Sequence, residues 1–210
     1  MTTLDIYSDP VCPWCYIGKA RLDAALQIRP DHGFRLTWHP FMLNPEMPPE
    51  GMDRGEHLEQ KFGSQKATVD IYLPVQKAAD EAGLPLDLGA IRRMPSTLDA
   101  HRLIHWAGLE GRQTAVVDAL FRGYFTEGAD IGDRAVLVAL AESAGMEPAV
   151  VARLLDSDAD TGAIRQRDAE IRARGLRGVP GFVIDGQYVI SGAQDVPTWL
   201  RIMDELAGRA

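Results

Sequence analysis

Two cysteines, Cys12 and Cys15, are the only thiols of the chain, and two residues separate them. Such a pair can form a structural disulfide, supply half of a zinc site or act as a redox-active dithiol. A disulfide closing a loop of about four residues contributes only roughly 2 kcal/mol, less than a longer loop would. Zinc needs about four ligands, and only His101 and His105, one helical turn apart, could complete the set. Such histidines are more often surface or packing residues, so we favour the redox dithiol and expect no metal.

The flanks of the pair place it between a strand and a helix. Residues 3–8 alternate polar and apolar side chains, which predicts a half-buried strand, and apolar residues recur at helical spacing over 17–28. Cys12 therefore lies at a helix N-terminus, where Pro13 fits because its missing N–H would be unpaired there. Unpaired N–H groups and the positive end of the helix dipole favour a thiolate at Cys12. Cys15, one turn on and more buried, would resolve the mixed disulfide that Cys12 forms.

Several separated blocks of the chain resemble the DsbA family of oxidoreductases, in its cytosolic FrnE-like branch. The blocks are residues 9–19, with Cys12-Pro13-Trp14-Cys15 at their centre, 38–45, 99–103, 124–128, 131–133 and 191–194. The 2-hydroxychromene-2-carboxylate isomerases and the kappa-class glutathione transferases are cousins of this branch. One departure is Ser96-Thr97, where relatives tend to carry Asn-Thr. The resemblance covers nearly the whole chain and implies a thioredoxin-like fold interrupted by an all-α domain.

Residues 178–182 resemble the family's cis-proline loop, which faces the dithiol. The residues alone favour a plain turn before a strand, whereas the resemblance implies a cis bond before Pro180 and a catalytic role for this residue beside the two cysteines. The backbone of Val179 would then pair with an extended substrate peptide. Pro13 and Trp14 are expected to contact substrate for the same reason.

Other polar and aromatic residues have weaker indications of a role. The resemblance implies that the substrate cleft is lined or supported by His39, Phe41, Asn44, His101 and Arg102. A solvated helix face or local packing explains His101 and Arg102 equally well. Lys19 and Arg21 fall on polar positions of the first helix, and a solvated face is their simplest interpretation.

The pattern along the chain predicts an α/β protein with a discontinuous domain. Residues 34–41 read as a strand parallel to the first, because a crossover of a dozen or more residues joins the two. A loop follows at 43–51, and every periodic segment from about 55 to 157 is helical, with Pro74 starting or kinking a helix. Asp185-Gly186 between two apolar runs predicts a hairpin, and a helix at 197–206 closes the chain. Residues 1–42 and 159–210 would form a thioredoxin-like domain, and residues 43–158 a helical insertion.

Charge and hydropathy restrict partners and location. The 22 basic against 30 acidic side chains give a net charge of −8, which disfavours nucleic acid. No apolar run reaches the 18 or so residues that span a bilayer, and the first residues lack the basic and apolar segments of a signal peptide. We expect a cytoplasmic protein. If its dithiol were as oxidising as that of DsbA, the redox potential of the cytosol, about 100 mV lower, would keep it reduced.

Three functions remain open from the sequence. The leading one is a thiol-disulfide oxidoreductase or isomerase acting on proteins or small-thiol disulfides, with no bound cofactor and with glutathione as a candidate ligand. The second is a glutathione-dependent isomerase or transferase like those of the cousins, in which a serine commonly stands at the position of Cys12. The third is a binding module that uses the dithiol as a redox sensor. Cysteine at both positions favours the first, and the sequence does not give the oligomeric state.

Overall fold

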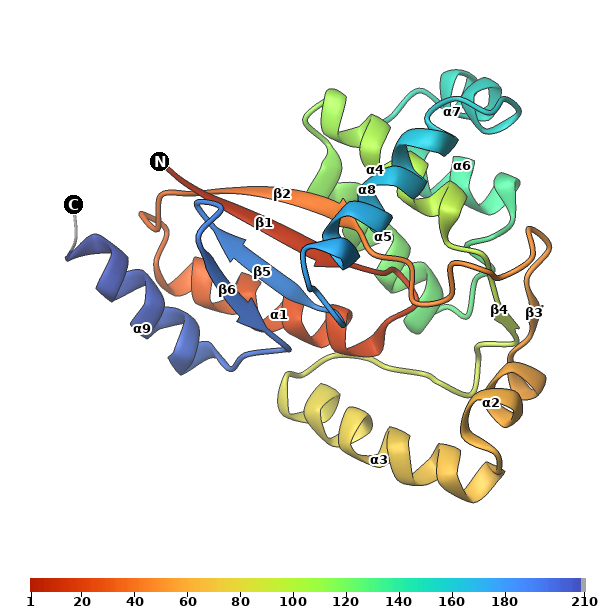
Figure 1. Ribbon diagram of the computed structural model, residues 1–210, viewed down its shortest axis with the longest axis horizontal. Helices are drawn as coiled ribbons and strands as arrows, with labels where there is room; N and C mark the ends of the chain where they lie inside the picture. Colours follow the sequence, from red (N-terminus) through yellow and green to blue (C-terminus); the bar gives the residue numbers. More distant parts are fainter. Residues whose placement is uncertain (209–210) are drawn as a thin grey trace.

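The computed structural model describes residues 1–208 and contains one four-stranded sheet (Figure 1). The sheet has the order β2-β1-β5-β6, with β1 at Thr2–Ser8, β2 at Phe34–Pro40, β5 at Gly181–Ile184 and β6 at Tyr188–Ser191. β1 and β2 are parallel, as the long crossover predicted, and β5 pairs antiparallel with both β1 and β6. The chain has the α/β thioredoxin-like fold, with a helical insertion between β2 and β5.

Helices cover the two faces of the sheet unequally. α1 (Pro13–Ile28) and α9 (Val196–Ala207) pack together beneath one face, where they bury the alternate residues Leu4 and Ile6 of β1. The Phe182 ring of β5 packs edge to face against the Trp199 ring of α9, with the ring centroids 4.8 Å apart. α8 (Thr161–Ala173) crosses the other face only in part (Figure 1). The side chains of that second face, Tyr7 among them, are therefore partly open.

The insertion is mainly helical, as predicted. Its helices are α2 (Arg54–Phe62), α3 (Gln65–Glu81), α4 (Leu98–Leu109), α5 (Gln113–Phe125), α6 (Arg134–Ser143) and α7 (Pro148–Leu155). Two short strands, β3 (Met52–Asp53) and β4 (Arg93–Met94), form an antiparallel pair that periodicity missed, because two residues carry no period. Pro74 lies inside α3 and does not begin it. The predicted domain boundary at 158 and 159 falls just before α8 and stays a prediction.

Aromatic rings join the active-site helix to the insertion. The Tyr16 ring of α1 stacks against Phe121 and Phe125 of α5, with centroid distances of 5.4 and 5.5 Å. Trp106 of α4 donates its indole N–H to an Asp160 carboxylate oxygen at 2.8 Å, beside the start of α8. The insertion is thus packed directly against α1 and is joined to the start of α8.

Lys19 corrects one expectation of the sequence. It was predicted to lie on a solvated face, yet its side chain is only 4% exposed and its ammonium contacts the Asp23 carboxylate at 2.6 Å and that of Asp118. Burial opposes the charged form, but attraction to the two carboxylates outweighs burial and raises the pKa of Lys19. Arg21 is also largely covered, and donates to the Ala193 carbonyl oxygen at 2.8 Å.

Residues 1–208 contain neither a membrane-spanning helix nor a cluster of metal ligands. None of the helices within residues 1–208 is long and apolar enough to cross a membrane. In the same part of the chain, no three His, Cys, Asp or Glu side chains gather in a way that could hold a metal ion.

Candidate active site

The dithiol lies at the junction of β1 and α1, where its flanks predicted it. Cys12 is the N-cap of α1 in an extended conformation, and Pro13 is the first helical residue. The Cys12 amide donates to the Asp9 carbonyl oxygen at 2.9 Å, and the Cys12 carbonyl accepts from Cys15 at 3.0 Å. Both cysteines are free thiols, with Cys12 4% and Cys15 1% exposed. Cys12 lies at the positive end of the helix, and Cys15 lies one turn further along it.

The loop at 178–181 faces the dithiol from the other side. The Val179–Pro180 bond is cis, as the family resemblance implied. The Val179 carbonyl oxygen is 3.8 Å from the Cys12 sulfur, and the Pro180 carbonyl accepts from the Gly192 amide at 2.8 Å. Gly18 allows the close approach, because a Cβ there would lie 3.0 Å from Cγ of Pro180. The loop is thus fixed between the hairpin and α1, next to Cys12.

The surroundings of Cys15 favour its protonated thiol form. Burial is the main factor that raises the pKa of the Cys15 thiol well above its ordinary value, and the neighbouring Cys12 raises it further. The Ser8 hydroxyl and the Asp9 backbone N–H act in the opposite direction and favour the thiolate. Cys15 is therefore a protonated thiol until its environment changes, which fits a resolving role better than a first attack.

Asp9 and His101 are buried near one another, and Nε2 of His101 has no hydrogen-bond partner among residues 1–208. One Asp9 carboxylate oxygen accepts from the Leu43 amide at 2.6 Å, and the other lies 3.7 Å from Nε2 of His101. Burial raises the pKa of Asp9 to about 7, and burial lowers the pKa of His101 to about 4. Asp9 was not predicted as a site residue, because Asp9-Pro10 resembles an ordinary end to a strand. The only feature of the sequence that could have pointed to it is its position three residues before Cys12.

Asn in place of Asp9 should change how stability depends on pH. A carboxyl with a pKa of about 7 when folded and near 4 when unfolded gives stability that is lost as pH rises towards 7. We expect the stability of the wild type, relative to Asp9→Asn, to fall by about 2 to 3 kcal/mol between pH 5 and pH 8. Urea denaturation of both proteins at several pH values measures this difference. A difference that does not vary with pH would show that Asp9 is ionised throughout.

Two of the residues predicted to bind substrate lie in the interior. Phe41 is 1% exposed, with the Arg172 guanidinium 3.9 Å from its ring centroid. His101 is buried against Asp9. The resemblance implied that both residues line the cleft or support it. Their burial favours the supporting role, which stays a prediction. Arg102 is buried as well, so a solvated helix face does not describe it.

The remaining predicted residues lie closer to the surface. Pro13 and Trp14 are partly buried in the first turn of α1, and Val179 is partly buried opposite them. Asn44 is partly exposed in the loop after β2, where its side-chain oxygen accepts from Lys61 at 3.4 Å. Nε2 of His39 forms a hydrogen bond with a carboxylate oxygen of Asp5, at a distance of 2.8 Å. A substrate role for Pro13, Trp14, Val179 and Asn44 stays a prediction.

Comparisons with known proteins identify similar chains over nearly the full length. Residues 3–204 match the family model described as DSBA-like thioredoxin domain. A crystal structure of a probable DsbA oxidoreductase from Streptomyces coelicolor is 31% identical and has a TM-score of 0.89, over 100% of this chain and 92% of that one. An uncharacterized protein of Bacillus subtilis, YwbO, is 28% identical over 90% of each chain. The cytosolic disulfide reductase DsbM from Pseudomonas aeruginosa, also solved with GSH, is 21% identical with a TM-score of 0.71, over 99% of this chain and 100% of that one.

Proposed function

Because this chain belongs to the DSBA-like thioredoxin domain family, we propose that it catalyses thiol-disulfide exchange with Cys12 as the nucleophile and Cys15 as the resolving thiol. The observation that carries the proposal is the position of the Cys12 sulfur. It lies at the N-terminus of α1 and 3.8 Å from the Val179 carbonyl, while Cys15 is one turn behind it. A substrate disulfide that approaches Cys12 meets the backbone of the cis-proline loop at the same time.

The reaction has two exchange steps. In the first, the Cys12 thiolate attacks one sulfur of the substrate disulfide, an S–S bond forms between Cys12 and substrate, and the second substrate sulfur leaves as a thiolate. In the second, Cys15 gives up its proton, which ends on one of the two substrate sulfurs, and attacks the Cys12 sulfur, so that the bond from Cys12 to the first substrate sulfur breaks and that sulfur leaves. The dithiol becomes a disulfide, and the substrate gains two electrons. Oxidation of a substrate dithiol is the same path in reverse.

The direction of exchange depends on the compartment. We propose a cytoplasmic protein of the FrnE-like branch, in which the cellular poise holds the dithiol reduced. Trp14 supports this assignment, because periplasmic relatives often carry a basic residue between the cysteines. Substrates would be protein disulfides or disulfides of small thiols, and glutathione is a candidate for recycling the oxidised form. DsbM, which shares this fold, has been solved with GSH.

Replacing Cys15 by alanine tests the proposed roles. This variant can complete the first exchange but not the second, so it should accumulate a mixed disulfide with an added protein disulfide such as insulin. Non-reducing electrophoresis should show an adduct that dithiothreitol removes, whereas the wild type should show little. A glutathione-dependent isomerase would behave differently. It would form no adduct with protein, and the double serine variant would isomerise 2-hydroxychromene-2-carboxylate in the presence of glutathione.

A further inference from the structure

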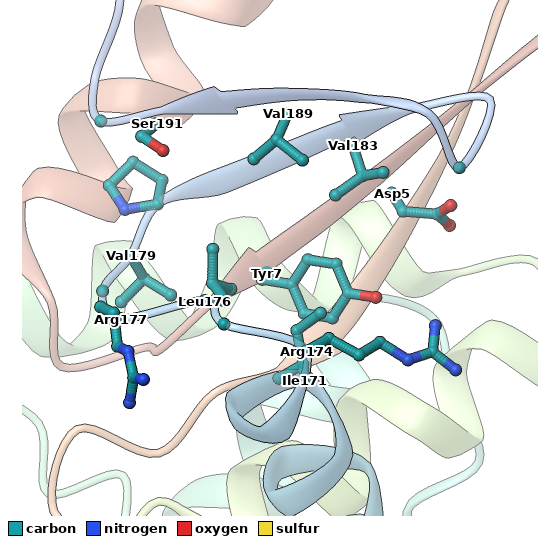
Figure 2. A pocket seen from close by; sticks show the side chains of 15 residues that line it. Asp5, Tyr7, Ile171, Arg174, Leu176, Arg177, Val179, Val183, Val189 and Ser191 are labelled. Atoms are coloured by element: carbon teal, nitrogen blue, oxygen red, sulfur yellow. The ribbon is translucent and has the colours of Figure 1, made fainter.

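A groove on the partly open face of the sheet begins at the cis-proline loop. Figure 2 shows it running from Val179 past Tyr7 towards Asp5 at the far end. Its volume is about 760 Å³, and it lies between the C-terminal end of α8 and the strands β1, β5 and β6. Val179 belongs both to the groove and to the surroundings of Cys12, whose sulfur is 3.8 Å from its carbonyl oxygen. The groove thus ends at the loop that contacts Cys12.

The floor of the groove is apolar and open. Val183 of β5 and Val189 of β6 project from the same face of the hairpin, with Tyr7 beside them (Figure 2). Val189 lies on the edge strand β6, and its side chain is 63% exposed. Leu176 adds an apolar wall from the loop after α8. Apolar side chains of an extended ligand would be buried against this surface, and their burial would favour binding.

Two arginines give the groove a charge opposite to that of the whole chain. Arg177 lies near Val179, and Arg174 extends below Tyr7 towards Asp5 (Figure 2). Neither guanidinium forms an ion pair with a carboxylate of residues 1–208. The Asp5 carboxylate is already bonded to Nε2 of His39 at 2.8 Å. In a protein of net charge −8, these two cations favour an acidic ligand at this face.

We propose that the groove binds the segment that adjoins the reacting disulfide of an acidic protein substrate. The segment would lie extended, with an apolar side chain over Val183 and Val189 and with carboxylates near Arg174 and Arg177. Glutathione fits less well, because it has no apolar side chain for the floor. This inference rests on the proposed disulfide chemistry and adds the class of sequence that the enzyme selects.

The test compares two peptide disulfides that differ only beside the cysteine. Each is a disulfide-linked dimer in which the cysteine is followed by valine and then by two glutamates or by two lysines. We expect the reduced wild type, followed through a single turnover in which its own dithiol supplies the two electrons, to react about tenfold faster with the glutamate peptide. Arg174→Glu with Arg177→Glu should reverse this preference. Arg153→Glu with Arg201→Glu, on exposed faces of α7 and α9, makes the same change in net charge and should retain it.

A small substrate separates failure of the groove from failure of the chemistry. Hydroxyethyl disulfide does not extend into the groove, so the wild type and the Arg153→Glu, Arg201→Glu protein should reduce it at the same rate. A wild type that reduces this compound yet treats both peptides equally overturns the groove proposal alone. If a second copy of the chain covers the groove, the preference is again absent, and Arg174→Glu with Arg177→Glu abolishes a dimer seen by sedimentation. A wild type that reduces no disulfide contradicts the proposed function itself.

Discussion

Cys12→Ser should reduce the catalysed rate of protein disulfide reduction at least about 1000-fold, to the background without enzyme. A serine hydroxyl forms no disulfide, so the first exchange step is lost. Cys15 cannot replace it, because this thiol is 1% exposed and burial raises its pKa. The turbidity that insulin reduction produces in dithiothreitol measures the rate. Ser for Cys is nearly isosteric, so unchanged circular dichroism and thermal unfolding should accompany the loss.

The opposite outcome would reassign the nucleophile. If Cys12→Ser retained most of the activity and Cys15→Ser lost it, Cys15 would be the attacking thiol, and the helix N-terminus would not be the reacting position. Gly18→Ala would test the packing of the cis-proline loop without altering either thiol, because the new Cβ would lie 3.0 Å from Cγ of Pro180.

Arg102→Met should destabilise the protein by about 3 to 5 kcal/mol, the largest effect on stability that we expect from a single polar side chain. The Arg102 guanidinium is buried and joins α4 to the segment between α7 and α8. It donates to the carbonyl oxygens of Leu154, Ser157 and Ala159 at 2.6 to 2.7 Å, and to the Asp99 carboxylate at 2.6 Å. Methionine fills part of the space but removes all four hydrogen bonds. The Leu154 carbonyl still accepts from the Ser157 hydroxyl, and Asp99 still contacts Arg134, whereas the Ser157 and Ala159 carbonyls lose their side-chain donor. The urea midpoint should fall accordingly.

Arg134→Met provides the matched control, because Arg134 contacts the same Asp99 carboxylate from an exposed position. Its side chain is 54% exposed and its Nε lies 3.5 Å from that carboxylate. Exposed ion pairs contribute little, so a loss of less than about 1 kcal/mol is expected. Equal losses in the two variants would mean that the hydrogen bonds to the buried carbonyls do not determine the stability of this segment.

The parts of the structure that depend on local sequence were predictable. The strand, the proline-started helix and the Asp185-Gly186 hairpin each follow from a few adjacent residues, and all three are present. The cis bond before Pro180 was expected only from the resemblance, since the adjacent residues also suit a plain turn. The strands at 52–53 and 93–94 were missed because pairs of residues that short show no pattern.

The buried charges could not be predicted, because distant segments determine their environment. Lys19 resembles a surface lysine until Asp118 of α5 packs beside it. Arg102 resembles any polar helix residue until the carbonyls after α7 surround it. Asp9 is buried by the chain at Leu43, 34 residues away. In each case the side chain meets its partner only where segments distant in the sequence pack together.

The most direct test of the proposed chemistry identifies the sulfur that holds the substrate. The adduct of Cys15→Ala with insulin should be digested without reduction, and mass spectrometry should locate the disulfide. The proposed mechanism predicts one product, in which a peptide containing Cys12 is linked to a substrate cysteine. The doubly substituted protein, with alanine at both positions, should give none. Absence of a Cys12-linked peptide from Cys15→Ala, while the wild type reduces insulin under the same conditions, would contradict the assignment of Cys12 as the nucleophile.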